Sequence, residues 1–127
     1  MPKSLKFEIE AGALSAVENA AIAAHYFVGS GDEISADKAA ISAMYDIINA
    51  MSVDAQIVFG EGDEFDSPYL FNGQKLGLGG DKFDIALDAI EGTTLAAKGM
   101  QNALSVIAIS PLGGLFKAPE VYMEKIA

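Results

Sequence analysis

Two long segments in the first half of the chain carry apolar residues at the spacing of amphipathic helices. Apolar positions recur every three or four residues in both, which predicts one helix over residues 5–28 and a second over 36–51. The recurring positions are Leu14, Val17, Ala21, Ala24 and Val28 in the first segment, and Ile41, Met44, Ile48 and Met51 in the second. Gly29-Ser30-Gly31 ends the first helix, and Ser35 is the predicted N-cap of the second.

From residue 55 onward the apolar runs shorten to the length of strands. Strands are predicted over residues 56–59, 69–71, 75–78, 83–87, 103–109 and 115–117, with a short helix over 95–98. Asn72-Gly73 predicts a two-residue hairpin turn between two of these strands. Two helices followed by strands in hairpin order predict an α+β fold, in which the two N-terminal helices pack on a mainly antiparallel sheet. At 127 residues, the chain has the size of one domain, over residues 1–127.

Composition and charge narrow the classes of function. Hydrophobic residues make up 51% of the chain and charged residues 20%, as expected of a globular protein. The longest apolar run, residues 20–28, is shorter than a membrane span, and residues 1–10 lack the apolar core of a secretory signal, so a cytoplasmic location is predicted. The net charge of −10 argues against nucleic acid and membrane surfaces as partners. With no cysteine, disulfides and thiolate metal sites are excluded.

Carboxylates stand at the ends of several predicted elements. Asp37 lies in the first turn of the second helix, Glu61 follows one strand, and Asp88 with Glu91 follows another. Carboxylate oxygens, with a single histidine in the chain, suit Mg²⁺ or Mn²⁺ better than zinc or copper. Such a set predicts a metal-dependent phosphatase site. The alternative also stands: a first-turn aspartate complements the helix dipole, and the acidic run 61–66 is typical of a solvated loop.

Glycines and hydroxyls accompany these carboxylates. Gly60 and Gly62 flank Glu61, and glycine permits tight turns and a close approach of the backbone to a ligand. Thr93 and Thr94 stand where the short helix is predicted to begin, a position whose backbone N–H groups favour a phosphate oxygen.

Asp88-Ala89-Ile90-Glu91-Gly92-Thr93 resembles the Asp-Pro-Ile-Glu-Gly-Thr signature of class II fructose-1,6-bisphosphatases. This family belongs to the lithium-sensitive, metal-dependent sugar phosphatase superfamily. Further segments resemble the same family in the same order along almost the whole chain. These are Gly31-Asp32 with Ser35-Ala36-Asp37, Ile57-Val58-Phe59-Gly60-Glu61-Gly62, Asp84-Ile85-Ala86, Gln101-Asn102-Ala103-Leu104, and Ala118-Pro119-Glu120-Val121-Tyr122-Met123-Glu124-Lys125.

The resemblance implies roles for individual residues. Asp37 and Glu61 would bind one divalent ion, Mn²⁺ or Mg²⁺, and Asp88 and Glu91 would bind another. It implies catalytic roles for Asp88, Glu91 and Thr93, and contacts to the sugar phosphate from Glu91, Gly92, Thr93 and Tyr122. The implied reaction is hydrolysis of the 1-phosphate of fructose 1,6-bisphosphate to fructose 6-phosphate and phosphate. Some family members also accept sedoheptulose 1,7-bisphosphate, and most are homo-oligomers.

The chain departs from the family in length and in a few positions. Members are well over twice as long, so the resemblance implies the N-terminal half of an αβαβα sandwich without its C-terminal domain. The remaining part of such a protein supplies a further glutamate ligand and the basic residues that grip phosphate. Ala89 replaces the signature proline, and Ser30 and Gly80 stand where a basic residue is common.

Three hypotheses follow from the resemblance and the departures. The first is the enzyme, represented by its N-terminal region and partnered by a C-terminal half or by other copies of itself. The second is a non-catalytic stand-alone domain that keeps the fold and serves as a metal-binding or assembly module. The third is a related sugar or inositol phosphatase with a different substrate.

Overall fold

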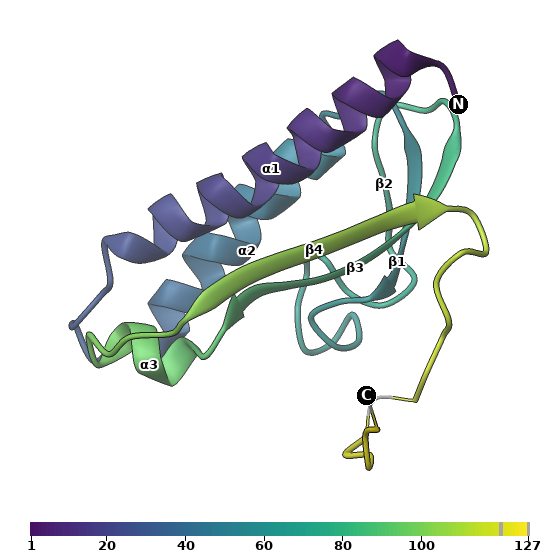
Figure 1. The fold of residues 1–127 in the computed structure, drawn as a ribbon. Coiled ribbons are helices and arrows are strands. Elements are labelled where there is room, and N and C mark those ends of the chain that lie inside the picture. Colours follow the sequence, from purple (N-terminus) through teal and green to yellow (C-terminus); the bar gives the residue numbers. More distant parts are fainter. Residues whose placement is uncertain (120, 127) are drawn as a thin grey trace.

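A computed structural model describes residues 1–119 and 121–126 and arranges them as helices on a four-stranded sheet (Figure 1). Glu120, which belongs to the last of the family-like segments, lies outside the described residues. The elements in chain order are α1 (Lys3–His25), α2 (Glu33–Asn49), β1 (Asp54–Phe59), β2 (Lys75–Leu76), β3 (Lys82–Glu91), α3 (Thr93–Ala97) and β4 (Leu104–Pro111). The predicted α+β class, with two N-terminal helices ahead of the sheet, is confirmed.

The two long helices form close to the predicted segments, but the apolar stripe predicted for α1 is wrong. Leu14, Ala21 and Val28 are exposed, and the buried residues of α1 are Ile9, Ala16, Ala20 and Ala24. The buried face of α2 is made by Ala36, Ala40, Ile41, Met44 and Ile48. The predicted N-cap is wrong, because α2 begins three residues earlier: the side chain of Asp32 accepts a hydrogen bond from the Ser35 N–H at 3.0 Å. Aspartate caps a helix as well as serine does, and Ser35 therefore falls inside the first turn.

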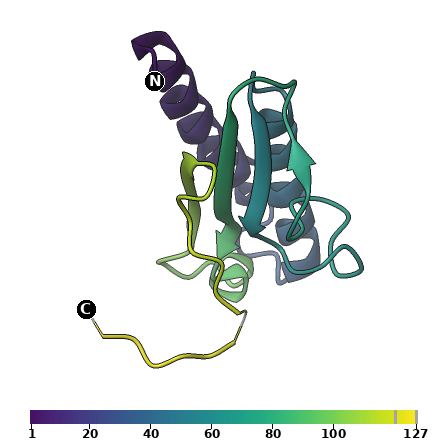
Figure 2. The same cartoon turned by 90° about the vertical axis from the view of Figure 1, so that its right-hand side faces the viewer.

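The sheet has the strand order β2-β1-β3-β4 and is mixed. The outer pairs, β1 with β2 and β3 with β4, are antiparallel, whereas the central pair of β1 and β3 is parallel. The sheet is therefore mainly antiparallel, as predicted, apart from its centre. Figure 2 shows α1 and α2 on one face of this sheet, which leaves the other face without a helix in the described part of the chain.

Two predicted strands do not form. The predicted hairpin around Asn72-Gly73 is wrong, because Leu70 adopts a left-handed φ of 60° and Lys75-Leu76 pairs with β1 instead of with residues 69–71. The Gly73 N–H donates to the Ile57 carbonyl at 2.8 Å, which places the turn against β1. Residues 115–117 also form no strand, since the chain turns away from the sheet after β4, at Gly113.

Alternation along β3 separates the core from the open face of the sheet. Phe83, Ile85 and Leu87 are buried in the core that includes the inner residues of α1 and α2. On β4, the exposed alternate residues Leu104 and Val106 belong to the open face. No helix in the part of the chain that the structure describes is long and apolar enough to cross a lipid bilayer.

Candidate functional site

A bulge in β3 brings Asp88 and Glu91 to the same face of the sheet. Asp88 pairs with Val106 and Glu91 with Leu104, so β3 advances three residues while β4 advances two. Residues three apart on a regular strand face opposite sides, and one extra residue in a bulge corrects that mismatch. Both carboxylates therefore line one cleft, whereas Ala89 and Ile90 between them are buried. The strand was predicted to end at residue 87, but both carboxylates belong to it.

Glu61 reaches this bulge from the end of the neighbouring strand. Its Oε1 accepts a hydrogen bond of 2.9 Å from the Ala89 N–H. Since β1 and β3 are parallel, their carboxyl ends meet at one edge of the sheet, and Glu61 follows β1 directly across from the bulge. This hydrogen bond fixes Glu61 beside the bulge, so three of the predicted ligands, Glu61, Asp88 and Glu91, line the same cleft.

The loop that presents Glu61 is held by hydrogen bonds to the segment around Asn72. The Gly60 N–H donates to Asn72 Oδ1 at 2.7 Å, and the Asn72 N–H donates to the Gly62 carbonyl at 2.8 Å. The Glu61 N–H donates to the Leu70 carbonyl at 2.9 Å. A Cβ at position 60 would collide with that same carbonyl, so only glycine fits there. Sequence reasoning missed this role of Asn72, because Asn-Gly was interpreted as a hairpin turn.

The carboxylates act on one another electrostatically. The pKa of Asp88 rises from 3.8 to about 7, first because of burial, then through a hydrogen bond with Glu91 and the negative charges of Glu61, Glu91 and Asp37. Burial also raises the pKa of Asp37, which projects from α2. All four predicted metal ligands thus contribute to one electrostatic cluster, and near neutral pH the Asp88 carboxyl is partly protonated.

The cleft that these carboxylates line has a volume of about 620 Å³. The rest of its wall is formed by Asp66, by Gly60 and Gly62, and by apolar side chains such as Phe59 and Val106, and no basic residue of the described chain lines it. Asp37 is not part of that lining. Among the described residues, no three carboxylates or imidazoles stand close enough together to hold a metal ion. The donor set nevertheless fits Mg²⁺ or Mn²⁺ chemically, because it consists of oxygen ligands whose mutual repulsion a cation would relieve.

Gly92 and Thr93 lie directly beyond the carboxylates. Gly92 adopts a left-handed φ of 87° and is the N-cap residue of α3, which begins at Thr93, where the helix was predicted to start. The Thr93 hydroxyl donates to the Ile90 carbonyl at 3.3 Å, so it is oriented toward the bulge. The Thr94 hydroxyl donates instead to Glu33 Oε2 at 3.0 Å and links α3 to the first turn of α2.

Tyr122 is not brought to the carboxylates. It lies in the C-terminal segment, fully exposed, and lines a separate surface hollow together with Phe59 and Pro119. Asp84, the first carboxylate of the same strand, is only 4% exposed and accepts a hydrogen bond of 2.7 Å from the Gly113 N–H. Its side chain fastens the turn after β4 and does not line the cleft.

The structure thus defines an α+β domain with a carboxylate-lined cleft where two parallel strands end. The sequence profile of a family described as "Bacterial fructose-1,6-bisphosphatase, glpX-encoded" matches residues 7–127. The chain belongs to this family.

Curated relatives agree with the family. "Fructose-1,6-bisphosphatase 1 class 2" of Escherichia coli (strain K12) is 46% identical over 110 residues, which cover 86% of this chain and 33% of that protein. "Fructose-1,6-bisphosphatase class 2" of Haemophilus influenzae is 44% identical over the same shares. "D-fructose 1,6-bisphosphatase class 2/sedoheptulose 1,7-bisphosphatase" of Synechococcus sp. is 39% identical over 90% of this chain and 37% of that protein. The chain spans about a third of the length of these relatives.

Proposed function

We propose that residues 1–127 form the N-terminal domain of a class II fructose-1,6-bisphosphatase and contribute part of its active site. The reaction is hydrolysis of the 1-phosphate of fructose 1,6-bisphosphate, giving fructose 6-phosphate and phosphate, as in gluconeogenesis. One observation carries the proposal: the charges of Glu61, Glu91 and Asp37 all act on the Asp88 carboxyl. A bound divalent cation would neutralise the repulsion between these carboxylates, so the cluster is suited to binding one.

Glu61, Asp88 and Glu91 would hold Mn²⁺ or Mg²⁺ in the cleft, with Asp37 as a further ligand from α2. A divalent cation at this position supplies Lewis acidity toward phosphate oxygens and lowers the pKa of water. The Asp88 carboxyl would release its proton when such a cation binds, because ligand carboxylates must be deprotonated.

Neighbouring groups orient the substrate in this proposal. The Thr93 hydroxyl, which donates to the Ile90 carbonyl, keeps lone pairs that accept a hydrogen bond from an attacking water. Gly92 and Thr93 offer backbone N–H groups to the sugar phosphate next to Glu91. Tyr122 would join them only if the C-terminal segment takes a different path from the exposed one it has here.

The name of the Synechococcus relative supports sedoheptulose 1,7-bisphosphate as a second substrate. We also propose a cytoplasmic location and a homo-oligomeric state, both by analogy with the family. A related sugar or inositol phosphatase remains the alternative for substrate.

A second candidate function, a non-catalytic cation-binding or assembly domain, is favoured by one feature of the cleft. No basic residue of the described chain lines it. Without a bound cation, the lining therefore offers no positive charge that would attract a phosphorylated sugar.

Phosphate release from fructose 1,6-bisphosphate in the presence of Mn²⁺ decides between the two candidates. A 127-residue chain and a longer natural chain, if the reading frame continues, should be assayed side by side, each also as the Asp88→Asn variant. The enzyme hypothesis expects turnover that Asp88→Asn abolishes. Binding of Mn²⁺ without turnover by either chain would favour the non-catalytic domain, and undiminished turnover in Asp88→Asn would refute the ligand role of Asp88.

A further inference from the structure

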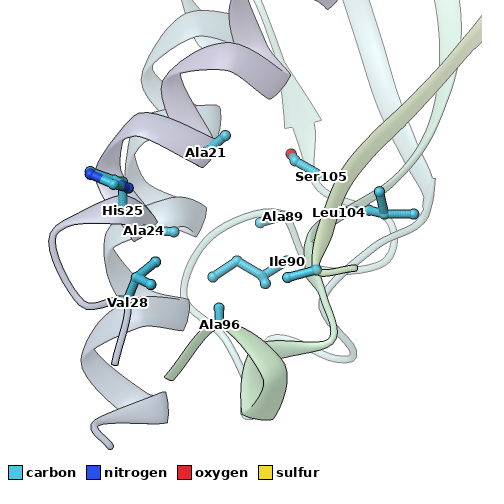
Figure 3. A pocket seen from close by; sticks show the side chains of 10 residues that line it. Ala21, Ala24, His25, Val28, Ala89, Ile90, Ala96, Leu104 and Ser105 are labelled. Carbon is cyan, nitrogen blue, oxygen red and sulfur yellow. The ribbon is translucent and has the colours of Figure 1, made fainter. Parts of the chain in front are cut away.

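A separate cavity lies on the reverse side of the segment that carries Asp88 and Glu91. It has a volume of about 180 Å³ and lies between the C-terminal end of α1, α3 and the adjoining parts of β3 and β4. Figure 3 shows alanine side chains from several elements around it, with Ile90 and Val28 completing an apolar wall. His25 lies at the outer edge and is exposed to solvent. None of the predicted metal ligands lines this cavity.

One polar atom in the cavity has no partner. Ser105 Oγ is buried and makes no hydrogen bond with any described residue. Ser105 occupies a position of β4 that alternates with the exposed residues and is followed on the same face by Ile107 and Ile109, which pack against the core. A hydroxyl at such a position is destabilising unless something supplies a hydrogen bond, because a buried polar group left unpaired loses its water. A molecule bound in the cavity would supply such a partner.

We propose that this cavity is a binding site for a small, largely apolar molecule with a single hydrogen-bonding group. Apolar cavities of roughly 150 Å³ bind molecules of the size of benzene, so the volume suits an aromatic ring or a short branched chain. The apolar wall binds the body of the molecule, and Ser105 Oγ binds its one polar group. A charged or strongly polar ligand fits poorly, since Ser105 and, at the outer edge, His25 carry the only polar side chains of the lining that replace its water.

The cavity lies directly behind the bulge in β3. Ala89 and Ile90 form part of the cavity wall, and they are the two residues between Asp88 and Glu91. A molecule in the cavity therefore contacts the back of the segment whose front lines the cleft. Binding itself does not depend on the proposed phosphatase function, and it is measurable without metal or substrate.

Phenol and toluene are matched probes, because they share a ring and differ in one hydroxyl. Titrations of the isotopically labelled chain, followed by the amide NMR signals of Ala89, Ile90 and Ser105, give a dissociation constant for each. We expect saturable binding of both, and the Ser105→Ala variant should weaken phenol roughly fivefold, the equivalent of one hydrogen bond, while leaving toluene unchanged.

Filling the cavity provides the second test. Ala21 lines the cavity but is exposed on α1, so Ala21→Leu should fold normally and abolish binding of both probes. Ala11→Leu adds the same leucine to α1 outside this cavity and should leave binding unchanged; a dispersed NMR spectrum verifies the fold of each variant. No saturable binding to the parent chain, or an equal response of both probes to Ser105→Ala, would overturn the proposal.

Discussion

The carboxylate of Glu61 accepts a hydrogen bond of 2.9 Å from the backbone N–H of Ala89, the residue that follows Asp88 in the β3 bulge. A bulge interrupts the regular ladder, and here a side chain from the end of β1 supplies the partner for one of its amides. The same side chain is a proposed metal ligand. The shape of the bulge and the position of that ligand are therefore linked.

Substitutions at Glu61 should separate its two roles. Glu61→Gln keeps a carbonyl oxygen for the Ala89 N–H, so we expect near-normal stability with a strong loss of Mn²⁺ affinity. Glu61→Ala removes both the metal ligand and the acceptor for the Ala89 N–H. It should therefore lower the unfolding free energy by a further ~1–3 kcal/mol, the penalty of an unpaired amide. Urea unfolding and calorimetric Mn²⁺ titration measure the two quantities. Equal unfolding free energies for the two variants would contradict a structural role for this contact.

The raised pKa of Asp88 predicts how stability depends on pH in the absence of metal. Because the folded pKa is about 7 against an ordinary value of 3.8, the folded chain binds the proton more tightly, and this contribution is lost as the pH rises from about 4 through 7. The parent chain should lose stability over this range, on the order of 1 kcal/mol after screening of a half-exposed group. Urea unfolding with a chelator present measures it.

Asp88→Asn should remove most of that pH dependence and leave the metal-free chain more stable than the parent at pH 8. Asp46→Asn, which changes an exposed aspartate on α2, is the matched control and should preserve the parent's pH profile. If both variants follow the parent, Asp88 is not the group responsible.

Binding of Mn²⁺ should release a proton at pH 6.5 and much less at pH 8.5. Below a pKa of about 7, Asp88 is largely protonated, and it must lose that proton to become a ligand. Titrations in buffers with different ionisation enthalpies count the released protons. The same count at both pH values would indicate that the cation binds elsewhere.

Asn72 should matter for cation binding although it does not line the cleft. Asn72→Ala leaves the Gly60 N–H without its side-chain acceptor and should lower stability by about 1 kcal/mol and loosen the loop that presents Glu61. We expect a several-fold weaker affinity for Mn²⁺. Asn72→Asp keeps an acceptor oxygen and should restore most of the stability, as measured by urea unfolding. An unaltered affinity in Asn72→Ala would show that the loop holds its shape without this bond.

The sequence predicted the elements that local pattern determines. The recurrence of apolar residues every three or four positions located α1 and α2, and apolar runs located β1, β3 and β4, because these signals depend on neighbours a few residues apart. Asp37, Glu61, Asp88 and Glu91 were identified from their places at element ends and from family resemblance. Asp37, Glu61 and Glu91 all raise the pKa of Asp88, as expected of residues that share one site. Their role as metal ligands stays a prediction.

Features that depend on pairing between distant residues escaped prediction. The Asn72-Gly73 turn has the local signature of a hairpin, but hydrogen bonds to Gly60, Gly62 and Ile57 direct it elsewhere. The bulge in β3 was also invisible, because a regular strand would have placed Asp88 and Glu91 on opposite faces. The position of Ser105 in a cavity could not be predicted from the sequence, because the cavity depends on the alanines that α1, α3 and β3 place around it.

The bulge sets a rule for anyone who wishes to transplant this pair of acids into another protein. On a flat, regular strand the two carboxylates would need one residue between them, and copying the Asp-x-x-Glu spacing would turn one acid away from the cation. A successful graft must carry the extra residue, a partner for the amide of residue 89, and a hollow behind the strand for two consecutive apolar side chains. The Asp-x-x-Glu motif can therefore be transferred only together with the structures on both faces of the strand that support it.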